Sequence, residues 1–186
     1  YSSPNIAKHL AVHHLRSALI GNAIYQLYKT LGYTCIGINH LGDWGTQFGQ
    51  LTVAYKRWGT ENAHTSYTVT DLNNLYIRFH QEAENDPDLE KEGREAFRKL
   101  EQGDKSLRAF WKDVVEITKS SLSSLYERLH VSFDVYDGES YYEDKMTPII
   151  EEGKKLGVFT KGREGALVVE FPEETGLPTY MVLKSD

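Results

Sequence analysis

A Ser-Ser-Pro-Asn turn opens this chain and separates a strand end from a long helix within the first sixteen residues, YSSPNIAKHLAVHHLR. The residue before a proline avoids helical geometry, so Tyr1–Ser3 is expected to be extended. Apolar side chains then recur at helical spacing from about Val12 to Leu31, and Gly32 is placed to cap that helix. The apolar, β-branched run Tyr33–Leu41 predicts a buried strand. Strand, helix and strand within about forty residues are a βαβ unit, which implies a parallel sheet.

Polar side chains follow both of these strands. Ser3–Asn5 comes after the first strand, and the glycine-punctuated turn Gly42–Gly45 comes after the second and precedes a helix expected over Thr46–Trp58. Ligands of open α/β sheets bind outside the carboxyl ends of the strands, and consecutive parallel strands are usually neighbours. Lys8 and a histidine pair stand near the start of the first helix, where free backbone N–H groups and the helix dipole favour anions. A site for a phosphate-bearing ligand is therefore expected at this edge of the sheet.

The remainder of the chain changes character after Gly59. It predicts charged amphipathic helices, a short extended element, one more helix and a final hairpin, over residues 71–85, 87–100, 105–129, 133–136, 142–156, 166–171 and 180–184. Asp104 is expected to cap the helix that begins at Lys105. We therefore expect an α/β fold in three parts: the first half of a Rossmann-like parallel-sheet domain over residues 1–59, a mixed α+β insertion over 60–178, and a strand returning to the first domain over 179–186.

Composition excludes several classes of protein. With 186 residues, the chain fits one domain with a sizeable insertion. Cys35 is the single cysteine, so no internal disulfide can form, which favours a reducing, cytoplasmic setting. No apolar run approaches the roughly 18 residues of a membrane span, and the first residues lack the pattern of a signal peptide. The net charge of −6 argues against a DNA-binding domain, so any contact with RNA is expected to be local.

Longer blocks of sequence point to one family. They are SSPNIAK, HHLRSALIGNAIYQLYKTLGY, NHLGDWGTQFGQL, LYIRFHQEAENDPDLE, YERLHVSFDVYDGESYYEDKM, EGALVVEF and LPTYMVLKSD. These blocks resemble the catalytic domain of arginyl-tRNA synthetase, a class I aminoacyl-tRNA synthetase, over essentially the whole chain. The resemblance implies the class I nucleotide-binding fold and an activity in which arginine is activated with ATP and then transferred to tRNA. ATP with Mg²⁺, arginine and tRNA(Arg) would then be the ligands of the longer protein.

The resemblance assigns roles to residues near the N-terminus. Ser3, Pro4 and Asn5 match the family segment that lines the arginine pocket, with His14 beside it; alone, Ser-Pro-Asn predicts only a turn. Lys8 matches a lysine that helps to bind the phosphates of ATP. Lys8 and His14 are therefore the residues expected to act in catalysis.

A second matching block, Gly42–Gly49, corresponds to family residues beside the active-site cleft. Gly42 and Asp43 are accordingly expected at the ATP site, where Asp43 would orient a helix or a substrate group. The alternative for Asp43 is an N-cap of the helix that follows. The block from Glu139 to Lys145 also matches the family, and its expected role is structural.

The nucleotide-binding motif itself departs from the family pattern, Lys-Pro-x-His-x-Gly-His-Leu-Arg-Ser. Ala11 stands where the first histidine belongs and His13 where the glycine belongs, whereas His14 is retained. A glycine lets a nucleotide approach the backbone closely, and the lost imidazole removes a donor to the phosphates. We therefore expect ATP to bind only if His9 or His13 replaces the missing histidine. The full set of expected ATP-binding residues is Lys8, His9, His13, His14, Gly42 and Asp43.

A metal site is the alternative use of these histidines. His9 and His13 are four residues apart, a spacing that allows two imidazoles to bind one metal ion from a helix. No acidic or cysteine side chain lies near them in the sequence, so no bound structural metal is expected.

The resemblance also implies that the active site includes residues outside this sequence. The family has an acidic residue directly before the position of Tyr1 and a Gly-Thr-x-x-Tyr segment after Asp186. We therefore expect a fragment that does not aminoacylate tRNA on its own. Two hypotheses for the longer protein stay open: an arginine–tRNA ligase with a variant motif, or a non-catalytic paralogue that binds RNA or protein.

Overall fold

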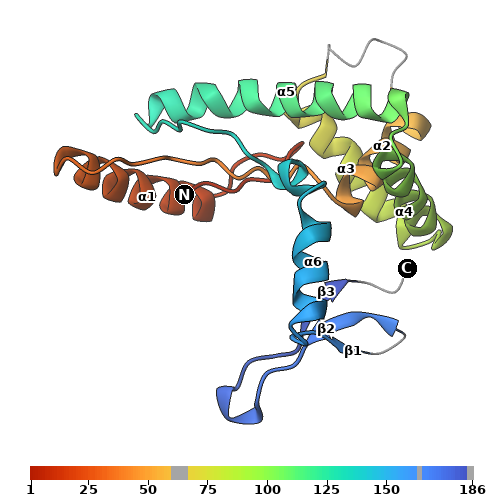
Figure 1. Ribbon diagram of the computed structural model, residues 1–186. Helices are drawn as coiled ribbons and strands as arrows, with labels where there is room; N and C mark the ends of the chain where they lie inside the picture. The colour runs from red at the N-terminus through yellow and green to blue at the C-terminus, as the bar shows by residue number, and fades with distance from the viewer. Residues whose placement is uncertain (60–66, 163–164, 184–186) are drawn as a thin grey trace. The chain divides into compact units, whose positions relative to one another are not determined.

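The computed structural model describes residues 1–59, 67–162 and 165–183, and its contacts divide the chain into two compact units (Figure 1). The first unit is Tyr1–Ser140 and the second is Tyr141–Asp186. Helices and strands are both present, which confirms an α/β fold. Within the described ranges, no helix is long and apolar enough to cross a membrane. The predicted domain boundaries near residues 59 and 178 stay predictions.

The helices of the first unit begin and end close to their predicted positions. They are α1 (Val12–Thr30), α2 (Thr46–Trp58), α3 (Val69–Ala83), α4 (Asp88–Glu101) and α5 (Lys105–Arg128). Two predicted caps are confirmed. Gly32 follows α1 with φ +87°, the left-handed region that glycine tolerates best. The Asp104 carboxylate accepts hydrogen bonds from the backbone N–H groups of Ser106 and Leu107 at 2.9 and 3.0 Å.

Extended segments of the first unit pair in parallel through isolated bridges. The bridges are Ser2–Asn39, Asn5–Gly42 and Ile38–Val135. Residues 37–42 therefore lie between the N-terminal segment and the segment near Val135. The backbone N–H of Gly42 donates to the carbonyl oxygen of Pro4 at 2.9 Å. This bond joins the first two segments near their carboxyl ends, where the polar residues follow. The parallel connection through α1 follows the predicted βαβ order.

The predicted buried strand Tyr33–Leu41 is wrong over its first half. Bridge pairing begins only at Ile38, and Tyr33 and Ile36 are 60% and 67% exposed. An apolar, β-branched run favours an extended backbone, but a strand also needs a neighbour that accepts and donates its hydrogen bonds. Among the described residues, Tyr33–Ile36 has no such neighbour in the bridges formed.

The main core of the first unit is a bundle formed by α2 to α5. Side chains that are almost wholly buried fill it: Leu51, Leu72, Phe79, Leu89, Leu100 and Val114. The most extensive helix contact joins α2 and α4. Gly49 of α2 lies against the backbone of Gly93 in α4, so the two helices approach closely at this point.

A smaller apolar cluster packs α1 and α5 onto the extended segments, which run between these helices in Figure 1. Its buried members are Ala18, Leu41, Leu122, Tyr126 and Val131. The phenol oxygen of Tyr126 lies 2.7 Å from Ser2 Oγ and accepts a hydrogen bond from Asn39 Nδ2 at 3.3 Å. This polar contact fixes α5 against the first two parallel segments.

Asp134 joins the C-terminal half of α1 to the same segments. Its Oδ2 accepts hydrogen bonds from the backbone N–H of Gly37 at 2.7 Å and from the Tyr25 hydroxyl at 2.8 Å. Lys29 in turn donates to the Tyr25 hydroxyl at 3.1 Å. The Gly37 N–H, followed by the Tyr25 hydroxyl, lowers the pKa of the Asp134 carboxyl.

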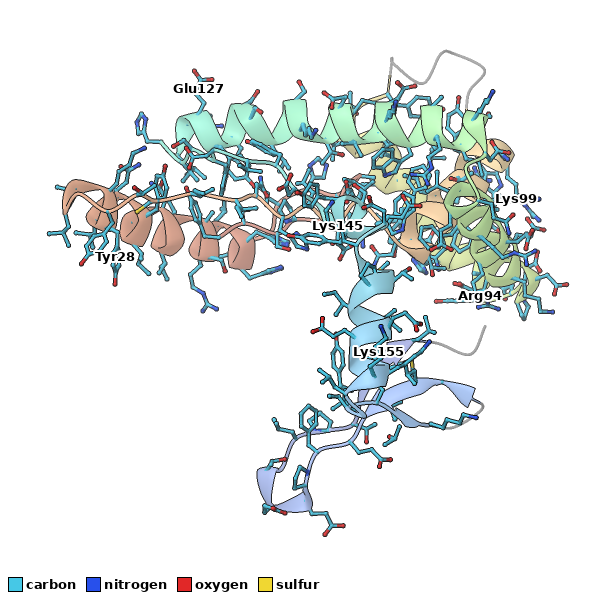
Figure 2. All side chains as sticks on the ribbon, in the orientation of Figure 1. Tyr28, Arg94, Lys99, Glu127, Lys145 and Lys155 are labelled. Carbon is cyan, nitrogen blue, oxygen red and sulfur yellow. The ribbon has the colours of Figure 1, made fainter. Side chains whose placement is uncertain are left out.

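Most apolar side chains of α1 lie on the surface of the described part of the chain. The helix buries Ala18 and Tyr25. Others on α1 and just after it are between 45% and 72% exposed: Leu19, Ile20, Ile24, Leu27, Tyr28 and Leu31. Tyr28 is labelled among them in Figure 2. The helical spacing of these residues predicts the helix correctly, but it does not predict which side of the helix is buried.

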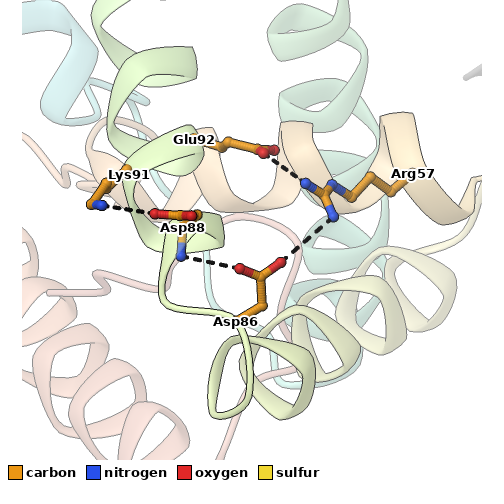
Figure 3. A network of polar contacts seen from close by, with 5 residues as sticks. All are labelled: Arg57, Asp86, Asp88, Lys91 and Glu92. Atoms are coloured by element: carbon orange, nitrogen blue, oxygen red, sulfur yellow. Dashed lines mark hydrogen bonds and ion pairs between the residues drawn. The ribbon is translucent and has the colours of Figure 1, made fainter.

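A surface network of ion pairs joins α2 to α4 and to the turn before it (Figure 3). Arg57 of α2 lies 2.6 Å from a carboxylate oxygen of Glu92 and 4.0 Å from one of Asp86. Asp86 also accepts a hydrogen bond from the backbone N–H of Asp88 at 3.2 Å. Because these side chains are exposed, each pair contributes at most about 1 kcal/mol, and its main effect is to orient the turn.

The second unit contains one longer helix and a small antiparallel sheet. The short 3₁₀ helix η2 (Glu139–Tyr142) includes the last two residues of the first unit and the first two of the second. The other elements of the second unit are α6 (Met146–Lys155), β1 (Thr160–Lys161), β2 (Leu167–Val169), η4 (Glu173–Thr175) and β3 (Tyr180–Leu183). The sheet order is β1-β2-β3 with antiparallel pairing, and Val169 pairs with Tyr180. The predicted final hairpin is therefore confirmed, whereas β1 was not predicted. The helix predicted over 142–156 begins later, at Met146, because the residues before it form turns.

Candidate functional site

A cavity of about 360 Å³ lies at the N-terminus of α1, beside the polar ends of the parallel segments. Its lining residues are Tyr1, Ser2, Ser3, His13, His14, Ser17 and His40. Each lining residue carries an imidazole ring or a hydroxyl group, and none of them is acidic. The Tyr1 and Ser17 hydroxyls already donate to the carbonyl oxygens of Ser132 and His13. The groups that can donate to a carboxylate or a phosphate here therefore include the imidazoles of His13 and His14 and the Ser3 hydroxyl.

His14 links this cavity to the start of α1. The backbone N–H of Ala11, the N-cap residue, donates to Nδ1 of His14 at 3.1 Å. Because Nδ1 accepts this bond, the proton of the neutral imidazole lies on Nε2, which is then a hydrogen-bond donor. The ring of His13 lies 3.9 Å from that of His14, centroid to centroid. Burial, and then the neighbouring His13, lower the pKa of His14.

The lowered pKa of His14 predicts a pH-dependent stability. In the unfolded chain His14 is protonated near the usual histidine pKa of about 6.5, whereas in the folded chain its pKa is lower. The unfolded state therefore binds more protons in this range, so the contribution of His14 is present above about 6.5 and is lost as the pH falls through the folded pKa. Urea unfolding of the chain and of His14→Gln, at neutral pH and about one unit below 6.5, measures this difference. Equal pH dependence of the two proteins would contradict the prediction.

Lys8 and His9 lie in a different, smaller cavity of about 170 Å³, between the N-terminal segment, α3 and α5. The Lys8 ammonium is 4.2 Å from the centre of the Tyr76 ring, a cation–π contact. Burial lowers the pKa of Lys8. His9 Nε2 lies 3.1 Å from the hydroxyl of Thr70. The structure therefore separates the predicted ATP-binding residues into two groups, with His13 and His14 in one cavity and Lys8 and His9 in the other.

The Ser-Pro-Asn segment contributes unequally to the larger cavity. Ser3 lines it, Pro4 is buried, and neither Pro4 nor Asn5 is among the lining residues. Asn5 Nδ2 donates to Gln47 Oε1 of α2 at 3.1 Å. A Cβ atom at Gly42 would overlap the Asn5 side chain, so glycine at position 42 allows these two segments to lie close together.

Asp43 is a buried structural group of the first unit. Its Oδ1 accepts a hydrogen bond from the Ser140 backbone N–H at 2.9 Å, and its Oδ2 accepts one from the Ser140 hydroxyl at 2.7 Å. Its backbone carbonyl accepts a hydrogen bond from the Trp111 indole at 2.7 Å. The N-cap alternative for Asp43 is wrong, because Gly45 is the N-cap of α2 and no side chain caps it. The structural role expected for Ser140 agrees with this contact.

His40 is a cavity residue that the sequence analysis missed. It lies between the buried Asn39 and Leu41, and its Nδ1 is 2.9 Å from the carbonyl oxygen of Asp137. The sequence signal that could have identified His40 is its place near the carboxyl end of the predicted strand Tyr33–Leu41, where α/β folds bind their ligands. Among residues 1–59, 67–162 and 165–183, no group of three or more His, Cys, Asp or Glu side chains is arranged to hold a metal ion.

Comparison with known proteins settles the family. Residues 1–186 match the family model described as tRNA synthetases class I (R), catalytic domain. The chain belongs to this family. The arginine–tRNA ligases of Alkaliphilus metalliredigens and Exiguobacterium sibiricum are both 48% identical over 186 residues, which is all of this chain. The chain spans about a third of the length of these relatives, 32% and 33%.

Solved structures support the same family fold. The arginyl-tRNA synthetase from Plasmodium falciparum superposes with a TM-score of 0.77 at 26% identity, covering 100% of this chain and 31% of that one. The Thermus thermophilus arginyl-tRNA synthetase has a TM-score of 0.64 at 20% identity, covering 99% of this chain and 32% of that one, and this likeness concerns the fold alone.

Proposed function

We propose that this chain is part of the catalytic domain of an arginine–tRNA ligase, which activates arginine with ATP and transfers it to tRNA(Arg). The observation that carries the proposal is the match of curated arginine–tRNA ligases to the entire chain at 48% identity. The oxyanion-binding character of the cavity at α1 is consistent with it. The longer protein is proposed to act in the cytoplasm, where the free thiol of Cys35 would stay reduced.

We also propose that residues 1–59 form the first half of a Rossmann-like parallel sheet. Parallel bridges on both sides of residues 37–42, together with the connection through α1, support this arrangement. The insertion is proposed over residues 60–178 and the returning strand over 179–186. In such a domain the cavity lies at the carboxyl ends of the first two strands, where α/β folds bind their ligands.

The arginine side of the site is proposed to comprise Ser3, Pro4, Asn5 and His14. Ser3 and His14 line the cavity directly. Pro4 and Asn5 act from behind it, because Pro4 is buried and Asn5 is bonded to Gln47 of α2. Their proposed contribution is to hold Ser3 in an extended position at the mouth of the cavity.

The ATP side is proposed to comprise Lys8, His9, His13, His14, Gly42 and Asp43. Of these, His13 and His14 line the cavity. Lys8 reaches a phosphate only by leaving the Tyr76 ring, and its partly buried, cation–π-bound position makes this a ligand-dependent step. The proposed role of Gly42 and Asp43 is indirect. Gly42 leaves room for the Asn5 side chain, and Asp43 accepts a hydrogen bond from the Ser140 backbone N–H.

The chemistry proposed for this site is positioning together with electrostatic stabilisation. Attack of the arginine carboxylate on the α-phosphate puts negative charge on the phosphate oxygens and on the leaving pyrophosphate. Preorganised donors aimed at that charge lower the barrier, and the Nε2–H of neutral His14 is such a donor. Mg²⁺ would arrive bound to ATP, since the imidazole and hydroxyl lining is better suited to phosphate than to a hard cation.

Arginine-dependent exchange of pyrophosphate into ATP tests the proposal. The longest natural chain that contains these residues is expected to catalyse the exchange and to arginylate tRNA, whereas residues 1–186 alone are expected to do neither. His14→Ala is expected to lower kcat/KM for the exchange about a hundredfold, the usual effect of losing one donor to developing charge. Glu116→Ala, an exposed change on α5, is the matched control and should leave the rate unaltered. A folded long chain with no exchange would contradict the ligase proposal and favour the non-catalytic paralogue.

A further inference from the structure

We propose that His13 is a phosphate-binding residue of the α1 cavity and supplies the imidazole that position 11 lacks. The inference rests on the proposed function, because it assigns one residue of this chain to the ATP side of that site. The sequence leaves His9 and His13 as equal candidates for this role. The structure distinguishes them by their surroundings.

His9 is turned toward the helical bundle. Its Nε2 lies 3.1 Å from the Thr70 hydroxyl of α3, and it lines the smaller cavity together with Lys8. To reach the larger cavity, His9 would have to give up this contact and change the path of the backbone before α1. In the arrangement the structure describes, His9 therefore does not take the place of the missing imidazole in the larger cavity.

His13 lies in the larger cavity beside the retained histidine. Its ring is 3.9 Å from the His14 ring, with 41° between the ring planes. The side chain is exposed, and its ring makes no hydrogen bond to any other described residue, so its nitrogens are available to a ligand. His14, by contrast, already uses Nδ1 to accept the Ala11 N–H. His13 can therefore offer either ring nitrogen to a ligand, whereas His14 can offer only Nε2.

The lining of this cavity selects an anionic group for that ligand. The His13 and His14 imidazoles and the Ser3 hydroxyl can donate to it, and no lining residue carries a carboxylate that would bind the arginine guanidinium. The two imidazole rings are 3.9 Å apart, centroid to centroid, so an oxyanion would bind beside the pair and accept hydrogen bonds from its nitrogens. The α-carboxylate of arginine and the triphosphate of ATP are both oxyanions. We assign His13 to the triphosphate, because His13 lies in the first turn of α1, where the backbone N–H groups also favour phosphate.

The test is His13→Ala in the longest natural chain that contains these residues, with Glu116→Ala, an exposed change on α5, as the control and His9→Ala as the comparison. His13→Ala is expected to lower kcat/KM for ATP about a hundredfold and to leave KM for arginine unchanged. Glu116→Ala is expected to leave both parameters unchanged, and His9→Ala is expected to lower kcat/KM for ATP less than His13→Ala does. Because His13 is exposed, the variant should keep the helical content and the unfolding midpoint of the parent.

A double variant tests directly whether the imidazole at position 13 replaces the one missing at position 11. Adding Ala11→His to His13→Ala is expected to restore most of the lost activity, which a merely structural role for His13 would not explain. Unchanged ATP kinetics in His13→Ala, or a change confined to KM for arginine, would overturn the inference.

Direct titration with ATP keeps the inference testable if the long chain proves inactive. Weaker ATP binding by His13→Ala than by His9→Ala, with Glu116→Ala unaffected, would support His13 as a phosphate ligand while the ligase proposal fails. Equal binding of ATP by the parent and by His13→Ala, or no binding by either, would overturn it.

Discussion

Replacing Asp43 by alanine is expected to lower the free energy of unfolding by about 3–5 kcal/mol, because each hydrogen bond to a buried carboxylate is worth about 1.5–3 kcal/mol. Both oxygens of this buried side chain accept hydrogen bonds from Ser140, one from its backbone N–H and one from its hydroxyl. The alanine variant would leave two partly buried donors of Ser140 without their partner. Chemical unfolding of the chain, monitored by circular dichroism, measures the loss.

Two smaller changes at the same contact provide the controls. Ser140→Ala removes only the hydroxyl bond and is expected to cost less than Asp43→Ala. Asp43→Asn keeps the size of the side chain but loses one acceptor, so its effect should lie between the two. If Asp43→Ala unfolded at the same denaturant concentration as the parent, the carboxylate would not be holding residues 138–140 in place.

Gly49→Ala is expected to destabilise the first unit by about 2 kcal/mol, although alanine is the better helix former by about 1 kcal/mol. A Cβ atom at position 49 would overlap the carbonyl oxygen of Gly93 and would lie 2.9 Å from the backbone nitrogen of Phe97. These are backbone atoms of α4, so they can move only if the two helices separate. The added methyl group would therefore open the tightest helix contact of the core.

The sign of this change separates packing from helix propensity. Ala109→Gly on the exposed side of α5 is the matched comparison, since it alters propensity alone and should cost about 1 kcal/mol. A rise in the unfolding midpoint of Gly49→Ala would show that α2 and α4 lie farther apart in solution than in the structure.

The sequence predicted the elements of the first unit better than their surroundings. α1 and α2 begin at the predicted residues, Val12 and Thr46, because helical spacing and caps are local signals. Tyr33–Ile36 failed as a strand because strand formation depends on a partner that lies far away in the sequence. The exposed apolar side chains of α1 illustrate the same limit, since periodicity marks an apolar face without saying what covers it.

The candidate site divides in the same way. Its location at the start of α1 and the retained His14 followed from the sequence and the family resemblance. The sequence did not predict that Lys8 and His9 lie outside that cavity. Both residues contact α3, Lys8 at Tyr76 and His9 at Thr70. The sequence also missed His40, which enters the cavity from the second parallel segment.

The sequence by itself determined the family, the helices and the altered motif at Ala11 and His13, because each of these is written in neighbouring residues. Only the tertiary structure decided that His13 rather than His9 shares a cavity with His14. It also decided that Asp43 holds Ser140 instead of capping α2. The physical reason is distance along the chain: Asp43 and Ser140 are 97 positions apart, so no local pattern records that they meet.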